Sequence, residues 1–279
     1  MVTASDVAGA VRAAIAQAAV TLRPDMRDAI VLAERAETSE RGRAVLRQLI
    51  ENADVAGADA VPLCQDTGTV WVRLEVGSEE CIGGDLQALV DDAVAGAYTE
   101  GALRMSMVRD ALFDRTNTGD NTPAWLELAS RPGRGARVDV MLKGGGSDNA
   151  SALAMLPPSA GCEGVRRFVL EAVEAKATGA CPPLLVGVAV GGTFDTVAAM
   201  AKKALLRPIG SPTADARAAD LERELLEAIN ATGIGPAGLG GRTTALAVHL
   251  VTAPCHIAAL PVAVNLGCCA LRSATRELA

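Results

Sequence analysis

The chain has 279 residues, of which 50% are hydrophobic and 2% are aromatic, and its formal net charge is −7. A chain of this length can bury a sizeable core, which Ala, Val, Leu and Ile must fill because aromatic rings are scarce. The acidic balance, the scattered basic residues and the few rings for base stacking all argue against a nucleic-acid partner.

The first sixty residues are predicted to be helical. Val7, Val11 and Ile15 recur at a spacing of four, which is typical of one face of an amphipathic helix. Asp6 and Arg12 lie within this first apolar stretch, and no basic segment precedes it. The N-terminus is therefore interpreted as a helix and not as a signal peptide.

Strand-like and helical segments alternate in the rest of the chain. The apolar or alternating patterns of strands occupy residues 69–76, 136–144, 184–192, 245–251 and 257–264. Helical patterns occupy residues 85–100, 164–177, 193–206 and 214–231. These patterns predict one helix-rich α/β domain of mixed α+β type over residues 1–279, with a helical part (1–60) and a second part (61–279) carrying polar loops at strand ends. Such loops are where an α/β scaffold places its chemistry.

The most apolar segment, 243–271, is interrupted by His249, Pro254 and His256, which would be costly in lipid. A buried core explains it better, and no membrane partner is expected. The seven cysteines are an odd number without a secretory signal. They indicate a reducing compartment, and the cytoplasm is the predicted location.

Free cysteine is among the most buried residue types, so Cys81, Cys162 and Cys255 are predicted to be inert core residues. Cys64 and Cys181 differ, since Cys64 precedes the sequence QDTG and Cys181 precedes two prolines. No compact CxxC repeat is present, which disfavours a ferredoxin-like cluster or a structural zinc site. Widely spaced cysteines that converge in space remain an open hypothesis.

Eight polar or glycine-rich motifs occur in a fixed order. They are CQDTGTV at Cys64, LRMSMV at Leu103, NTGDNTPA at Asn117, KGGGSDN at Lys143, CPPLLVGVAVGG at Cys181, KKALLRPIG at Lys202, GPAGLGGRTT at Gly235 and HIAALPVAVNLGC at His256. Together they resemble the N-terminal domain of class I fumarases, a domain shared with the α subunit of tartrate dehydratases. The resemblance covers residues 62–272, far more than one glycine-rich match.

The resemblance implies a 4Fe-4S cluster that is held by three cysteines and has one iron open to substrate. The matching ligands are Cys64, Cys181 and Cys268, with the adjacent Cys269 as an alternative third ligand. An open iron would act as a Lewis acid for adding water to a double bond beside a carboxylate. A structural zinc protein is a further alternative.

The resemblance also implies roles for residues beside these cysteines. Asp66 matches the acid/base and Gln65 a substrate contact, although Asp66 taken alone would simply cap the DTG turn. Arg104 matches a substrate-binding arginine, for which the alternative is a solvated helix charge.

His256 matches the active-site histidine, whereas His249 lies in an apolar alternating strand and is expected to be a core residue. Gly144 and Gly145 are assigned to substrate contact through bare backbone N–H groups, although a tight turn would have the same sequence. The NTGDNTP loop, with Asn121, is expected to support the site by hydrogen bonds.

Class I fumarases carry a second domain that completes the active site, and we expect a separate β subunit to supply it in an α2β2 heterotetramer. The predicted reaction is the reversible hydration of fumarate, a small dicarboxylate, to L-malate. Ser273 departs from the histidine that fumarases often have after the arginine, so tartrate or mesaconate remain alternative substrates. A non-catalytic iron–sulfur protein is the alternative from another class.

Overall fold

The computed structural model describes residues 1–213 and 215–279, which pack as two compact units. Unit 1 consists of Met1–Arg23, Ala53–Gly145 and Leu271–Ala279, and unit 2 of Pro24–Asn52 and Gly146–Ala270. The chain therefore leaves unit 1, returns to it for its long middle segment and returns again for its last residues. A long helix, α3 (Glu40–Asp59), contains the second of these boundaries.

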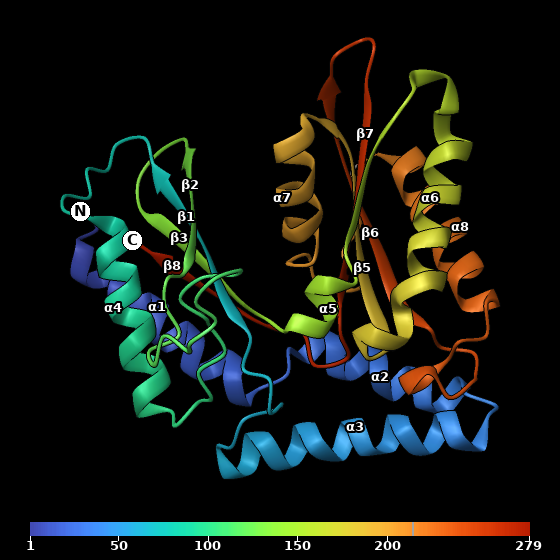
Figure 1. Cartoon of the computed structure of the whole chain (residues 1–279), viewed down its shortest axis with the longest axis horizontal. Coiled ribbons are helices and arrows are strands. Elements are labelled where there is room, and N and C mark those ends of the chain that lie inside the picture. The colour runs from blue at the N-terminus through green and yellow to red at the C-terminus, as the bar shows by residue number, and fades with distance from the viewer. Residues whose placement is uncertain (214) are drawn as a thin grey trace. The chain divides into compact units, whose positions relative to one another are not determined.

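Unit 1 is built on a four-stranded sheet with the order β2-β1-β3-β8. Its strands are β1 (Thr69–Gly77), β2 (Trp125–Arg131), β3 (Ala136–Lys143) and β8 (Arg272–Leu278). β1 pairs with β2 in parallel and with β3 in antiparallel fashion, and β8 is antiparallel to β3. The helices α1 (Ala4–Val20) and α4 (Leu86–Glu100) pack on this sheet and on each other (Figure 1).

Local sequence explains where the helices of unit 1 begin. Thr3 and Asp6 form a reciprocal capping box at the start of α1. Asp85 caps α4 through its carboxylate, which accepts a hydrogen bond from the N–H of Ala88. The core between the helices and the sheet is made almost entirely of Val, Leu and Ala, and Tyr98 of α4 is the one aromatic side chain buried in it among the described residues.

Unit 2 is built on a second four-stranded sheet, with the order β4-β7-β5-β6. Its strands are β4 (Ala152–Leu156), β5 (Leu184–Gly192), β6 (Ala245–Cys255) and β7 (Leu260–Gly267). Only β5 and β6 are parallel, and β7 is antiparallel to both β5 and β4. Helix α7 (Phe194–Ala204) covers one face of this sheet, and α6 (Gly161–Lys176) and α8 (Ala216–Ala231) cover the other (Figure 1).

The remaining elements of the described residues are two helices and three 3-10 turns. Unit 2 also contains α2 (Pro24–Ala36), and α5 (Gly145–Asn149) begins where β3 of unit 1 ends. Three 3-10 turns occupy Pro158–Ala160, Ala177–Ala180 and Pro236–Gly238.

The predicted mixed α/β class, the helical first sixty residues and the strands at 69–76, 136–144 and 184–192 are confirmed. The predicted strand at 257–264 begins later, at Leu260, because residues 256–259 form a turn. Strands β2, β4 and β8 escaped prediction. Ala214, the predicted first residue of the last helix, lies outside the described residues, and α8 begins at Ala216.

No helix in the described ranges has both the length and the apolar composition needed to cross a bilayer. The apolar segment 243–271 contains β6 and β7, each of which pairs with β5, as expected for a buried core.

Candidate active site

The turn that joins Cys64 to β1 carries Asp66 and is built by close backbone contacts. Gly68 has a φ of +80°, and a Cβ at this position would lie 2.7 Å from the main chain of Lys143. Only glycine fits here without displacing backbone. The DTG sequence therefore places Asp66 directly against the end of β3.

Three consecutive carbonyl groups of this turn accept hydrogen bonds from side chains of three different segments. The donors are the Arg272 guanidinium to the Asp66 carbonyl, the Tyr98 hydroxyl to the Thr67 carbonyl (2.9 Å) and the Asn121 amide to the Gly68 carbonyl (3.2 Å). All three donor side chains are buried. Buried hydrogen bonds of this kind fix the position of the turn before any ligand arrives.

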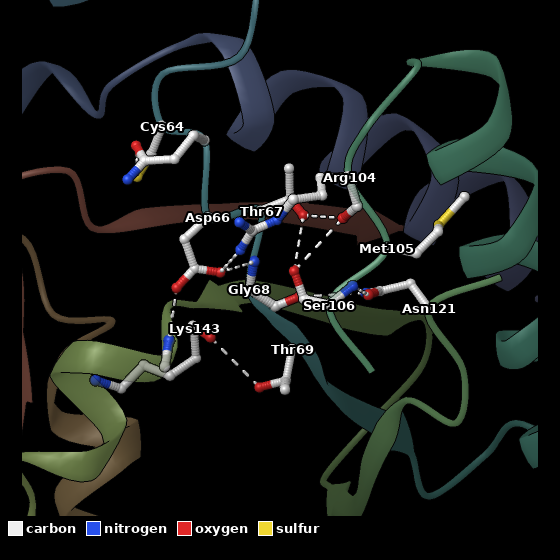
Figure 2. A network of polar contacts seen from close by, with 12 residues as sticks. Cys64, Asp66, Thr67, Gly68, Thr69, Arg104, Met105, Ser106, Asn121 and Lys143 are labelled. Carbon is white, nitrogen blue, oxygen red and sulfur yellow. Dashed lines mark hydrogen bonds and ion pairs between the residues drawn. The ribbon is translucent and has the colours of Figure 1, made fainter. Parts of the chain in front are cut away.

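The Asp66 carboxylate is held from three sides (Figure 2). Its Oδ1 accepts the N–H of Gly68 at 3.1 Å and lies 3.3 Å from Nη2 of Arg104. Its Oδ2 accepts the N–H of Gly145 at 2.8 Å. The turn cap expected from the sequence is thus present, but the carboxylate also joins the end of β3 and a guanidinium. With 29% of its side chain exposed, it remains accessible.

Arg104 is placed by contacts of its own main chain. Its carbonyl accepts a hydrogen bond from the hydroxyl of Thr67, in the same turn as Asp66. The N–H of Ser106 donates to Oδ1 of Asn121 at 2.6 Å, so Asn121 contacts both the Arg104 segment and the Asp66 turn (Figure 2). The Arg104 side chain is 58% exposed, which leaves its guanidinium able to bind a carboxylate.

Gly144 and Gly145 leave space beside Asp66. A Cβ on Gly144 would lie 3.2 Å from Oδ2 of Asp66, and a Cβ on Gly145 would lie 3.8 Å from the same atom. In this structure the N–H of Gly145 donates to that carboxylate. The bare backbone N–H predicted from the GGG motif therefore faces an anion of the protein itself.

The NTGDNTP loop is internally hydrogen-bonded. Asn117 accepts from the N–H of Gly119 and donates to the Met105 carbonyl, and Asp120 accepts from the N–H and the hydroxyl of Thr122. The hydrogen bonds from Thr122 keep the pKa of Asp120 below its usual value. These bonds shape the loop that presents the buried Asn121.

The remaining predicted site residues are divided between the units. Gln65 is exposed in unit 1, and its Oε1 lies 3.4 Å from the Cys64 thiol. Cys181 and Cys268 belong to unit 2, where the N–H of Cys269 donates to the Cys181 carbonyl at 3.1 Å. Cys181 has a left-handed backbone conformation, and its side chain is exposed. Among the described residues, no group of three or more His, Cys, Asp or Glu is gathered as a metal site.

The two histidines differ as expected from the sequence. His249 is buried, with Nδ1 3.1 Å from the Ala204 carbonyl. His256 is exposed in the turn between β6 and β7, where its Nδ1 accepts the N–H of Ala258 at 3.1 Å. His256 is therefore the accessible one.

The prediction that Cys81, Cys162 and Cys255 are core residues is wrong, because all three are exposed. Cys81 lies in the loop between β1 and α4, Cys162 lies in the first turn of α6, and Cys255 is the last residue of β6. Each lies in a loop or at an element end, where the chain reaches solvent. All seven cysteines are in the thiol form and not in disulfides.

Glu37 is a buried carboxylate that the sequence did not reveal. It lies just after α2, is 0% exposed and accepts backbone N–H groups from Thr38, Ser39, Arg242 and Thr243. Burial opposes its charged form, but the four N–H donors outweigh burial and lower the pKa of Glu37 below its ordinary value. Glu37 thereby fixes the GLGGRTT loop of unit 2.

Comparison with known proteins covers both units. The family model described as fumarate hydratase (fumerase) matches residues 8–277. A Methanocaldococcus jannaschii protein named "Putative L(+)-tartrate dehydratase subunit alpha" is 40% identical over 268 residues, which is 94% of each chain. The L(+)-tartrate dehydratase subunit alpha of Escherichia coli K12 is 38% identical over 255 residues, covering 90% of this chain and 84% of its own.

Proposed function

Because the chain belongs to the fumarate hydratase family and is a hydro-lyase, we propose that it is the α subunit of an enzyme that adds water to, or removes it from, a four-carbon dicarboxylate. The observation that carries the proposal is the arrangement of Asp66 and Arg104. A positioned carboxylate lies 3.3 Å from an exposed guanidinium, at the end of a turn held by buried donors. Such a reaction requires a proton-transfer group beside a carboxylate-binding group, and this pair of side chains supports the proposal for that reason.

Arg104 binds one substrate carboxylate through its planar guanidinium, which matches a carboxylate with two parallel hydrogen bonds. The substrate carboxylate then replaces Asp66 as a partner of Arg104. Asp66 stays in place because the N–H groups of Gly68 and Gly145 still hold its two oxygens. A carbon next to the bound carboxylate is thus brought to Asp66, which removes its proton in dehydration and returns it in hydration.

Gln65 and His256 are proposed as further substrate contacts. Both side chains are exposed. Because Nδ1 of His256 accepts the N–H of Ala258, Nε2 is the ring nitrogen left to face a ligand. Gly144 and Gly145 are also proposed to contact substrate. They have no side chain, so their backbone beside Asp66 is open to a ligand.

Cys64, Cys181 and Cys268 are proposed to hold a 4Fe-4S cluster. The donor set fits such a group, since the three cysteines are thiols that take part in no disulfide and the N–H of Cys269 donates to the Cys181 carbonyl within unit 2. When bound, the cluster supplies a Lewis acid that polarises the substrate hydroxyl and carboxylate.

The choice between Cys268 and Cys269 can be made with single serine variants reconstituted anaerobically. Cys268→Ser is expected to lose the brown absorbance of the cluster, and Cys269→Ser to keep it. Loss in Cys269→Ser with retention in Cys268→Ser would move the third ligand by one position.

Two substrates are equally supported. The family description favours fumarate, which is hydrated to L-malate, whereas the relatives' names favour L(+)-tartrate, which is dehydrated. Both reactions involve a four-carbon hydroxydicarboxylate: L(+)-tartrate has a hydroxyl group on each of its two central carbons, whereas L-malate has one. Arg104 and Asp66 serve either reaction, so recognition of the extra hydroxyl must come from other groups.

A β subunit is proposed to supply the rest of the active site, because the relatives are named as α subunits. We propose an α2β2 assembly and expect little or no turnover from the α chain alone. The absence of disulfides among the seven cysteines is consistent with a reducing compartment, and the cytoplasm stays the predicted location.

The proposal is tested by anaerobic reconstitution of the chain with its β subunit and assays with fumarate, L(+)-tartrate and mesaconate. If the turnover rate with fumarate or with tartrate is at least tenfold higher than the rates with the other two compounds, that compound is the substrate. No turnover of any of them by cluster-loaded protein would support the non-catalytic alternative. Appreciable steady-state turnover by the α chain alone would contradict the two-subunit site.

A further inference from the structure

Arg272, the first residue of β8, carries a guanidinium group buried in unit 1. The residue is 2% exposed, so it cannot reach a substrate in solution. Its Nη1 donates to the main-chain carbonyl of Asp66, and its Nε–H has no acceptor among the described residues. A buried guanidinium with an unsatisfied N–H is costly, and an apolar side chain such as methionine would fill the space without that cost. Packing alone therefore does not explain this residue.

The Arg272 guanidinium and the Asp66 carboxylate both lie near Gly144. A Cβ placed on Gly144 would lie 3.5 Å from Nη2 of Arg272 and 3.2 Å from Oδ2 of Asp66. Both charged groups therefore flank the same point beside the Gly144 α-carbon. A side chain at residue 144 would crowd the carboxylate oxygen and would meet the guanidinium at van der Waals distance, so Gly144 leaves open the space that both groups border.

Tyr98 experiences the same two charges. Burial raises the pKa of its hydroxyl to about 12, while the positive charge of Arg272 acts in the opposite direction and the negative charge of Asp66 adds to the rise. The hydroxyl donates to the Thr67 and Gly68 carbonyls, next to the carbonyl that Arg272 holds. Of the three buried side chains that donate to the carbonyls of this turn, Arg272, Tyr98 and Asn121, only Arg272 is charged.

We propose that Arg272 is a positioning residue for the reaction: it fixes the main chain of Asp66 and directs its carboxylate toward the substrate, with Gly144 leaving the room for this approach. The inference rests on the proposed function of Asp66. Lysine at this position would keep the charge but lose the planar fork, and methionine would lose both. A small displacement of a reacting group is enough to cost on the order of a hundredfold in rate.

Arg276 provides a matched control on the same strand. It also donates to main-chain carbonyls, those of Thr275 (3.0 Å) and Ala13 (3.3 Å). Neither carbonyl belongs to the Asp66 turn. Arg272→Lys and Arg272→Met are compared with Arg276→Lys in the cluster-loaded two-subunit enzyme. We expect kcat to fall about tenfold in Arg272→Lys and about a hundredfold in Arg272→Met, with KM within twofold, unchanged cluster absorbance and no change in Arg276→Lys.

Hydrogen exchange of the full α chain gives a second readout that does not need activity. The N–H groups of Gly68 and Gly145 donate to the Asp66 carboxylate, so they should exchange at least fivefold faster in Arg272→Lys than in Arg276→Lys. Unchanged kcat together with unchanged exchange would overturn the proposal, as would a loss confined to KM. If the wild-type enzyme proves inactive, the proposed function fails, and the exchange rates alone decide whether Arg272 positions Asp66. If Arg272→Met does not fold, Arg272→Lys carries both measurements.

Discussion

Asp66 in unit 1 and Glu37 in unit 2 are both carboxylates that accept hydrogen bonds from backbone N–H groups of distant segments. Glu37 is 0% exposed and receives four backbone donors, so every oxygen position is used by the protein. Asp66 is 29% exposed and receives two backbone donors and one exposed guanidinium. Two similarly hydrogen-bonded carboxylates therefore serve different purposes. Glu37 fixes a loop, and Asp66 keeps its carboxylate accessible to a ligand.

The comparison also shows how each unit uses glycine beside its carboxylate. At Glu37, a Cβ on Gly241 would lie 2.9 Å from Oε2 and 3.1 Å from Oε1. At Asp66, a Cβ on Gly144 would lie 3.2 Å from one oxygen only. The fit around Glu37 is tighter on both oxygens, which agrees with a purely structural role.

The largest expected effect on stability comes from Glu37→Gln. The amide NH₂ would replace one oxygen and face backbone N–H groups, which would leave buried donors unsatisfied at a cost of about 3 kcal/mol. The urea midpoint of unfolding should fall, while kcat per folded enzyme stays unchanged. Glu51→Gln, on the exposed face of α3, is the control and should change neither. A wild-type urea midpoint in Glu37→Gln would show that the hydrogen bonds to the Glu37 carboxylate do not hold the loop.

A smaller effect is expected from alanine at Gly241. This residue has a φ of +143°, so Gly241→Ala adds backbone strain to the contact with Glu37, and we expect a loss of about 2 kcal/mol. Gly240→Ala is matched to it, because Gly240 also has a positive φ (+84°) but open space around its Cβ position. That variant should lose about 1 kcal/mol from strain alone. Equal losses in urea unfolding would mean that the contact with Glu37 contributes nothing.

The smallest expected effect is a pH dependence. The folded pKa of Glu37 lies below its ordinary value of 4.5, so ionised Glu37 stabilises the fold above that pH. This contribution is lost as the pH falls through the folded pKa. Stability of the wild type should therefore decline more steeply below pH 4.5 than that of Glu37→Gln. Parallel curves for the two proteins would contradict a lowered pKa.

The sequence predicted the elements and loops whose signals are local. The strands β1 and β5 are continuous β-branched or apolar runs, and the aspartate and glycine of DTG are local signals that predict a turn. Strand β2 was missed because its side chains alternate between exposed and half-buried at a sheet edge, which gives a weak apolar pattern. Strand β8, with the sequence RSATREL, was missed because its residues are mostly polar, although Arg272 and Ser273 are buried.

The residues that hold the carboxylates could not be predicted, because their partners are far away in the chain. Arg272 contacts a residue 206 positions earlier, and Glu37 contacts Arg242, 205 positions later. Neither has a periodic or motif-like neighbourhood that distinguishes it from a surface charge. Tyr98 offered one clue, since it is the chain's single tyrosine and lies on an apolar helix face. A buried hydroxyl must find a partner, but sequence does not say which one.

The most direct test of the account is turnover by Asp66→Asn in the cluster-loaded two-subunit enzyme. Asparagine keeps the size of the side chain and an oxygen for one of the two backbone donors but cannot accept a proton from carbon. We predict that kcat falls at least a hundredfold while the cluster absorbance stays as in the wild type, and that the urea midpoint falls less than in Glu37→Gln because Asp66 is 29% exposed. Activity within threefold of the wild type would remove Asp66 from the chemistry and contradict the proposed function of this site.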